Sequence, residues 1–139
     1  MLAPVCAPPL FLLSMTNSHV AVFPSLHAGQ FFPQICVLDS GYDLGHEDLP
    51  NASHGVDGYS PYQKHYADQL WDVDGNGHGT HVAGTIGAIG GNGIGVTSVN
   101  PDPNKFTFFI GKAFTNENRA WVSYFEEARV KIIIRIFST

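Results

Sequence analysis

The chain has little charge, and no Asp, Glu, Lys or Arg occurs before Asp39. Its 139 residues include 7 Lys and Arg against 12 Asp and Glu, which gives a net charge of −5. Because nucleic acids are bound through clustered basic side chains, this composition argues against a nucleic-acid partner. No apolar run reaches the roughly 20 residues that a membrane-spanning helix needs, so we expect no transmembrane segment.

Cysteine is also scarce. The two cysteines, Cys6 and Cys36, cannot form a disulfide framework of the kind that holds small secreted domains together. Cys36 lies in an apolar run, where a thiol usually behaves as a small buried hydrophobic side chain. Cysteine content therefore does not indicate a cellular compartment.

The uncharged N-terminal segment, residues 1–34, is rich in Pro, Ala, Leu and Phe. Residues 10–15 have the composition of the apolar core of a signal peptide, but no Lys or Arg precedes them. Two interpretations stay open, a signal peptide and a poorly ordered leader, and the first favours an extracellular location. Residues 35–139 have the composition of one folded domain.

Apolar patterning after residue 34 predicts alternating strands and helices. A strand is expected at 34–38, ending at Asp39, and a helix from His78, where apolar side chains recur at helical spacing. Residues 42–77 are polar and glycine-rich and predict loops. A strand at 105–111, a helix at 116–129 with Asn116 as N-cap, and a strand at 130–137 complete the pattern. This order predicts an α/β fold, a parallel sheet with helices on both faces, with functional groups beyond the carboxyl ends of strands.

The stretch "DGNGHGTHVAGT", residues 74–85, permits several functions. As a calcium loop it lacks the closing glutamate, because Ala83 occupies that position. As a phosphate-binding loop it lacks a lysine after its glycines. A metal pair formed by His78 and His81 is geometrically feasible at this spacing, although no third ligand is evident.

A fourth interpretation explains more of these residues. His78 at the start of a helix could serve as a general base if a carboxylate fixed its tautomer. Asp39, at the end of a buried strand, offers that carboxylate. Together, "VLDSG" and "DGNGHGTHVAGT" resemble the Asp and His blocks of the subtilisin-like serine proteases, the subtilases. The resemblance implies that Asp39 is the orienting acid, that His78 is the general base, and that His81 has a structural role.

The resemblance covers residues 35–137, the N-terminal part of a subtilase catalytic domain, and implies an incomplete subtilisin-like sheet. The family's nucleophile lies in a Gly-Thr-Ser block, and none of the nine serines has that context. We therefore expect a serine-type endopeptidase by family, acting on protein or peptide substrates, with this chain alone inactive for lack of the nucleophile. The alternative is a non-catalytic α/β module that binds a peptide or a metal.

The resemblance also implies a structural calcium ion. "HEDL" would contribute Asp48, and "GGNGIGV" would contribute the Asn92 side chain and the carbonyls of Gly90, Ile94 and Val96. Oxygen ligands of this kind suit calcium. A simple turn held by its glycines and Asn92 is the alternative explanation.

Overall fold

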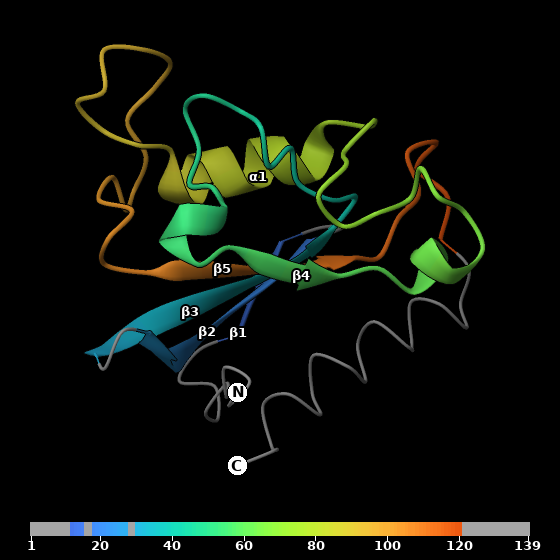
Figure 1. The fold of residues 1–139 in the computed structure, drawn as a ribbon, viewed down its shortest axis with the longest axis horizontal. Coiled ribbons are helices and arrows are strands. Elements are labelled where there is room, and N and C mark those ends of the chain that lie inside the picture. The colour runs from blue at the N-terminus through green and yellow to red at the C-terminus, as the bar shows by residue number, and fades with distance from the viewer. Residues whose placement is uncertain (1–11, 16–17, 28–29, 121–139) are drawn as a thin grey trace.

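The structure is a computed structural model that describes residues 12–15, 18–27 and 30–120 (Figure 1). The described elements are five strands, one α-helix and two short 3-10 helices. In chain order they are β1 (Leu12–Met15), β2 (Ser18–His27), β3 (Gln30–Asp39), η1 (Ala52–His54), β4 (Asp57–Tyr59), η2 (Pro61–Lys64), α1 (His78–Gly87) and β5 (Thr107–Lys112).

The five strands form one sheet in the order β1-β2-β3-β5-β4. β5 runs parallel to both β3 and β4, which confirms the α/β fold with a parallel sheet. β1 and β2 add antiparallel strands on the far side of β3. These strands belong to the segment assigned to a leader, and the expected boundary at residue 34 falls inside β3.

The centre of the sheet is apolar on both faces, as is usual for parallel strands covered by other elements. Every residue of β5 is buried, and Val37 of β3 with Phe108 and Ile110 of β5 are fully inaccessible. The parallel register places Asp39 opposite Lys112, at the carboxyl end of both strands. The Asp39 carboxylate therefore lies at the carboxyl edge of the sheet, where functional groups of parallel α/β folds are usually found.

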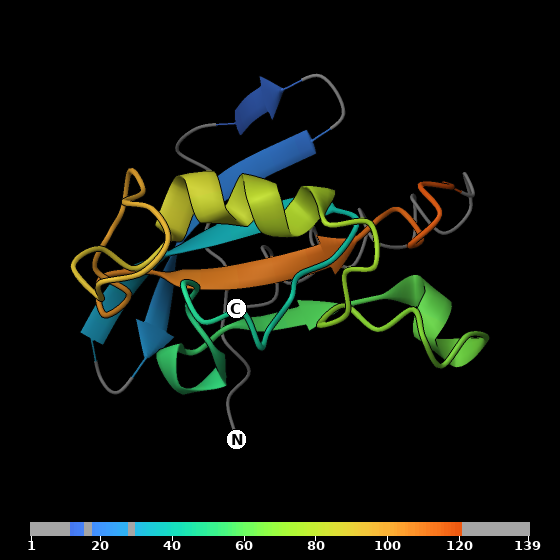
Figure 2. The same cartoon turned by 90° about the horizontal axis from the view of Figure 1, so that it is seen from above.

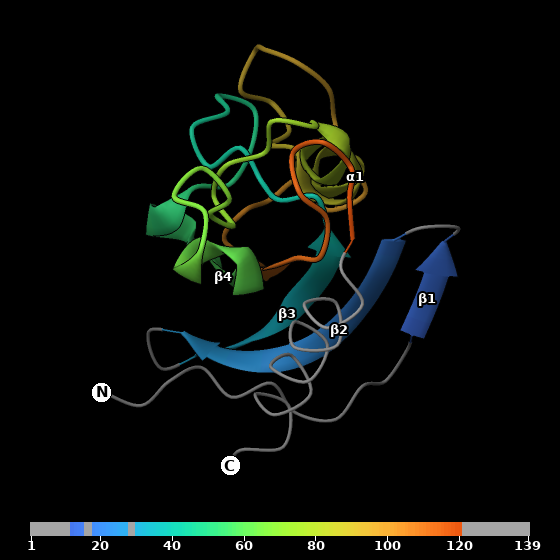
Figure 3. The same ribbon diagram turned by 90° about the vertical axis from the view of Figure 1, so that its right-hand side faces the viewer.

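Helix α1 lies over one face of the sheet (Figures 2 and 3). Ala83 is fully buried against the sheet, and Gly87 brings the helix close to two phenylalanines. A β-carbon at Gly87 would lie 2.5 Å from Cζ of Phe106, so a larger residue here would force the phenylalanine rings to move. None of the helices in the described ranges has the length and apolar composition for crossing a bilayer.

The second expected helix does not begin where the sequence indicated. Residues 116 and 117 form a turn, and Asn118 follows with a φ of 59°, so the prediction of Asn116 as a helix N-cap is wrong. The Asn116 side chain instead bonds to Lys112 and to the Gly75 amide. The remainder of that helix, and the strand expected at 130–137, lie outside the described residues.

Candidate active site

Asp39 and His78 lie in direct contact at the carboxyl edge of the sheet. His78 is the first residue of α1, and its Nδ1 lies 2.7 Å from Oδ1 of Asp39. The Asp39 side chain is 2% exposed, whereas that of His78 is 51% exposed. An ionised carboxylate only accepts hydrogen bonds, so Nδ1 carries the proton. Nε2 is then the nitrogen that can accept a proton from another group.

The end of β3 holds the Asp39 carboxylate in one orientation. The Ser40 backbone N–H donates to Oδ1 of Asp39 at 2.7 Å. The Asp39 carbonyl accepts from Ala113 N at 2.6 Å, which fixes the backbone from the side of β5. A buried charge needs such partners, because an unpaired carboxylate away from water is costly.

The start of α1 rests on the turn that follows Asp39. The Gly79 N–H donates to Oγ of Ser40 at 2.9 Å. A β-carbon at Gly79 would lie 2.2 Å from the Gly41 carbonyl oxygen and 3.2 Å from Cβ of Asp39. Position 79 therefore requires glycine, because the start of α1 lies so close to Asp39 and the turn after it.

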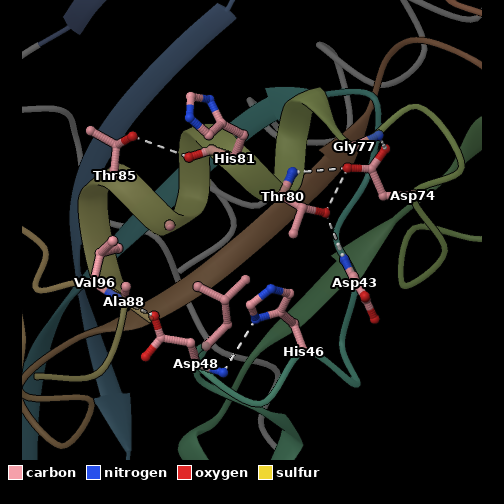
Figure 4. Close-up of a pocket in the computed structure, with 12 residues that line it drawn as sticks. Asp43, His46, Asp48, Asp74, Gly77, Thr80, His81, Thr85, Ala88 and Val96 are labelled. Carbon is pink, nitrogen blue, oxygen red and sulfur yellow. Dashed lines mark hydrogen bonds between the residues drawn. The ribbon is translucent and has the colours of Figure 1, made fainter. Parts of the chain in front are cut away.

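Asp74 caps α1, a role that the sequence analysis missed. Its Oδ2 accepts from Thr80 N at 2.8 Å and from Thr80 Oγ1 at 2.6 Å (Figure 4). Its Oδ1 accepts from Gly77 N at 3.0 Å and from Ser40 Oγ at 2.9 Å. Burial opposes ionisation, but these hydrogen bonds outweigh it and lower the pKa of Asp74. An acidic residue shortly before a helix start is the sequence signal that could have found it.

His81 lies on the exposed side of α1 and lines a groove between α1 and the 43–49 segment. Figure 4 shows its ring directed away from the ring of His46, which lines the same groove. Within the described ranges, no group of three or more His, Cys, Asp or Glu side chains is placed to hold a metal. The structural role expected for His81 stays a prediction.

The residues expected to bind calcium converge on Asp48. Asn92 Nδ2 donates to Oδ1 of Asp48 at 2.8 Å, and Val96 N donates to Oδ2 at 2.8 Å. The hydrogen bond from Val96, followed by that from Asn92, lowers the pKa of Asp48. Ile94 N also donates to Oδ1 of Asn92 at 3.2 Å, so hydrogen bonds link four of the five residues. The groups directed at the Asp48 carboxylate are N–H groups, and not further oxygens.

A buried Asp at the end of a strand and a His at the start of an α-helix, in direct contact, have the geometry of the acid and base of a serine-hydrolase triad. Residues 33–117 match the family model described as the Subtilase family. The chain belongs to the subtilase family.

Two relatives and one solved structure illustrate the similarity. The chain is 38% identical over 85 residues to subtilisin-like protease 1 of Plasmodium berghei (strain Anka), covering 49% of this chain and 14% of that protein. It is 36% identical over 108 residues to the major intracellular serine protease of Bacillus subtilis (strain 168), covering 72% and 32%. The crystal structure of the psychrophilic subtilisin-like protease Apa1 from Pseudoalteromonas sp. AS-11 matches with a TM-score of 0.53 and 33% identity, over 70% of this chain and 21% of that one. The chain thus spans about a third or less of these proteins.

Proposed function

We propose that this chain supplies the acid and the base of a serine-type endopeptidase that cleaves protein substrates. The observation that carries the proposal is the 2.7 Å contact between Nδ1 of His78 and Oδ1 of Asp39. Family membership supports a subtilisin-like serine protease as the class. The half-exposed imidazole supports it further, because Nε2 of a general base must be accessible to the group whose proton it accepts.

The reaction assigns one task to each residue. A serine hydroxyl attacks the peptide carbonyl while Nε2 of His78 removes its proton, and the imidazolium then donates that proton to the leaving amine. Asp39 holds Nδ1–H throughout and stabilises the positive charge of the imidazolium. No Gly-Thr-Ser block occurs in the 139 residues, so we propose that these residues alone do not hydrolyse peptides at the rate of a triad.

A grafted enzyme tests this function. In it, residues 33–117 of this chain replace the matching segment of the Bacillus subtilis major intracellular serine protease, which retains its own serine. We expect the graft to cleave a peptide substrate and to be labelled by a fluorophosphonate probe. We expect neither activity from the 139-residue chain. Peptide cleavage by the isolated chain that the probe blocks would contradict the proposal.

A groove of about 430 Å³ beside α1 is the observation that favours the alternative, a binding module. Its lining includes His81, one member of the His78–His81 pair that the sequence permits as metal ligands, so a metal is the simplest ligand to test. Calorimetric zinc titration of the unmodified chain and of the His81→Ala variant measures the affinity and the stoichiometry of metal binding. Stoichiometric binding that His81→Ala abolishes would favour the module over the protease.

We also propose that Asp48 and the loop 90–96 hold a structural calcium ion. The proximity of Asp48, Asn92 and Val96 supports the site, and the carboxylate is a suitable hard ligand. The carbonyls of Gly90, Ile94 and Val96 would complete the set, with Asn92 presenting its oxygen. A bound ion would stabilise the fold and takes no part in the proton transfers described above.

A further inference from the structure

Lys112 is a buried cation that neither the motif nor the reaction above uses. It is the last residue of β5, stands opposite Asp39 in the sheet, and has no exposed surface. Its Nζ donates to the Ser40 carbonyl, to the Val73 carbonyl at 2.8 Å and to Oδ1 of Asn116 at 2.8 Å. An ammonium group has three hydrogens, so these three acceptors satisfy it.

The three acceptors belong to segments that carry the active site. Ser40 follows Asp39 directly, and Val73 precedes Asp74, the carboxylate that caps α1. Oδ1 of Asn116 also accepts from the Gly75 N–H at 3.0 Å, within the same loop before α1. A single ammonium thus connects the end of β3, which carries Asp39, with the loop that leads to α1, which begins at His78.

The packing around this ammonium leaves little freedom. A β-carbon at Gly41 would lie 3.0 Å from Nζ and 2.7 Å from the Val73 carbonyl oxygen. Gly41 has a φ of 127°, a conformation that glycine adopts without strain. Lys112, the Gly41 turn and Val73 are therefore in close contact beside the chain that follows Asp39.

Burial makes the positive charge of Lys112 unfavourable for the stability of the fold. Burial lowers the pKa of Lys112, and the carboxylates of Asp74, Glu117 and Asp68 oppose that effect. A lowered lysine pKa means that the charged form is less favourable in the folded chain than in the unfolded chain. An apolar side chain would avoid this cost, but it could not donate the three hydrogen bonds to the Ser40 carbonyl, the Val73 carbonyl and Asn116.

We propose, on the basis of the function proposed above, that Lys112 is a positioning residue for the His78–Asp39 pair. Its three hydrogen bonds hold the turn after Asp39 and the loop before α1 in one relative arrangement. Without them, the Ser40 and Val73 carbonyls lose their donor, and Asp74 loses its nearby positive charge. The contact between Nδ1 and Oδ1 then lengthens or fluctuates.

The test is the NMR signal of the His78 Nδ1 proton in the 139-residue chain. A proton held in a short hydrogen bond to a buried carboxylate resonates far downfield and exchanges slowly with water. We expect this signal in the unmodified chain, and we expect Lys112→Met to abolish it or to accelerate its exchange by about tenfold or more. Lys105→Met is the matched control, because Lys105 is exposed and pairs only with Asp102 at 3.3 Å among the described contacts. It should leave the signal unchanged.

Asn116→Ala is the second variant, because it removes one acceptor of Lys112 at a partly exposed position. If Lys112→Met does not fold, this variant decides, and we expect a weakened or faster-exchanging signal. A signal that persists unchanged in a folded Lys112→Met chain, or in Asn116→Ala when Lys112→Met is unfolded, overturns the role of Lys112. Absence of the signal from the unmodified chain would instead overturn the proposed acid–base pair itself, so the two failures are distinguishable.

Discussion

Gly79 and Gly41 approach so closely that a β-carbon on Gly79 would lie 2.2 Å from the Gly41 carbonyl oxygen. One glycine belongs to the helix that begins with His78, and the other belongs to the turn after Asp39. Their contact brings the nearby residues His78 and Asp39 close together, because no side chain separates the two segments. The glycines of the two motifs thus allow the short distance between His78 and Asp39.

A comparison of two glycines in α1 tests this contact. We expect Gly79→Ala to destabilise the chain by about 1–3 kcal/mol or more through overpacking. Gly84→Ala should stabilise it by up to about 1 kcal/mol, because alanine favours the helix and its β-carbon would lie 3.7 Å from Leu49. Urea unfolding of both variants measures the difference, and equal effects of the two substitutions would contradict the close approach.

Stability should depend on pH through Asp74. The pKa of Asp74 is lower in the folded chain than its ordinary value of about 3.9. Its contribution to the free energy of unfolding is therefore present above that value and is lost as the pH falls through the folded pKa. We expect Asp74→Asn to cost about 1–3 kcal/mol at pH 7 and less below pH 4. A cost that stayed constant from pH 7 to pH 3 in urea unfolding would show that the charge does not matter.

Removing the charge of Asp39 should slow the grafted enzyme without preventing substrate binding. For the orienting acid of subtilisin-type triads, the loss in kcat is about 10⁴-fold, and we expect the same order for Asp39→Asn. KM should change little, because Asp39 is buried behind His78 and does not reach the substrate. Steady-state kinetics of the graft give both parameters, and a variant that retained more than a tenth of kcat would exclude Asp39 as the acid.

Calcium should raise the thermal unfolding midpoint of the chain if Asp48 binds it. Asp48→Asn should remove that increase, whereas Asp102→Asn should preserve it, because Asp102 instead contacts Asn104 and Lys105. Differential scanning fluorimetry with calcium and with a chelator measures the four combinations. An unchanged midpoint for the unmodified chain, at calcium concentrations up to several millimolar, would contradict the proposed calcium site. Asp48 would then be explained by its hydrogen bonds from Asn92 and Val96 alone.

The local sequence was sufficient to predict the strand before Asp39, the helix from His78 and a strand at 105–111, which the structure places at Thr107–Lys112. Each depends on a short apolar pattern, and the motif glycines mark where the helix meets the strand. The pairing of β1 and β2 with β3 was not predicted, because strand pairing depends on partners that composition does not specify.

The candidate site shows the same division. Asp39 and His78 were singled out because a motif carries them, whereas Asp74 was given no role of its own and Lys112 lay one residue beyond the expected strand at 105–111. The roles of the latter two arise from contacts across the fold, between residues such as Lys112 and Ser40 that lie 72 positions apart. Asn116 was expected to begin a helix. In the structure its side chain accepts a hydrogen bond from Lys112, and the chain turns at Asn118.

The most direct test of the central claim compares kcat of His78→Ala and His81→Ala in the grafted enzyme. Both histidines lie on α1 three residues apart, but only His78 contacts Asp39 among the described interactions. We expect His78→Ala to lower kcat by about 10⁶-fold, the order seen when subtilisin loses its base, and His81→Ala to lower it by less than about tenfold. Comparable losses from the two substitutions, or a His78→Ala enzyme with most of its activity, would contradict the assignment of His78 as the general base.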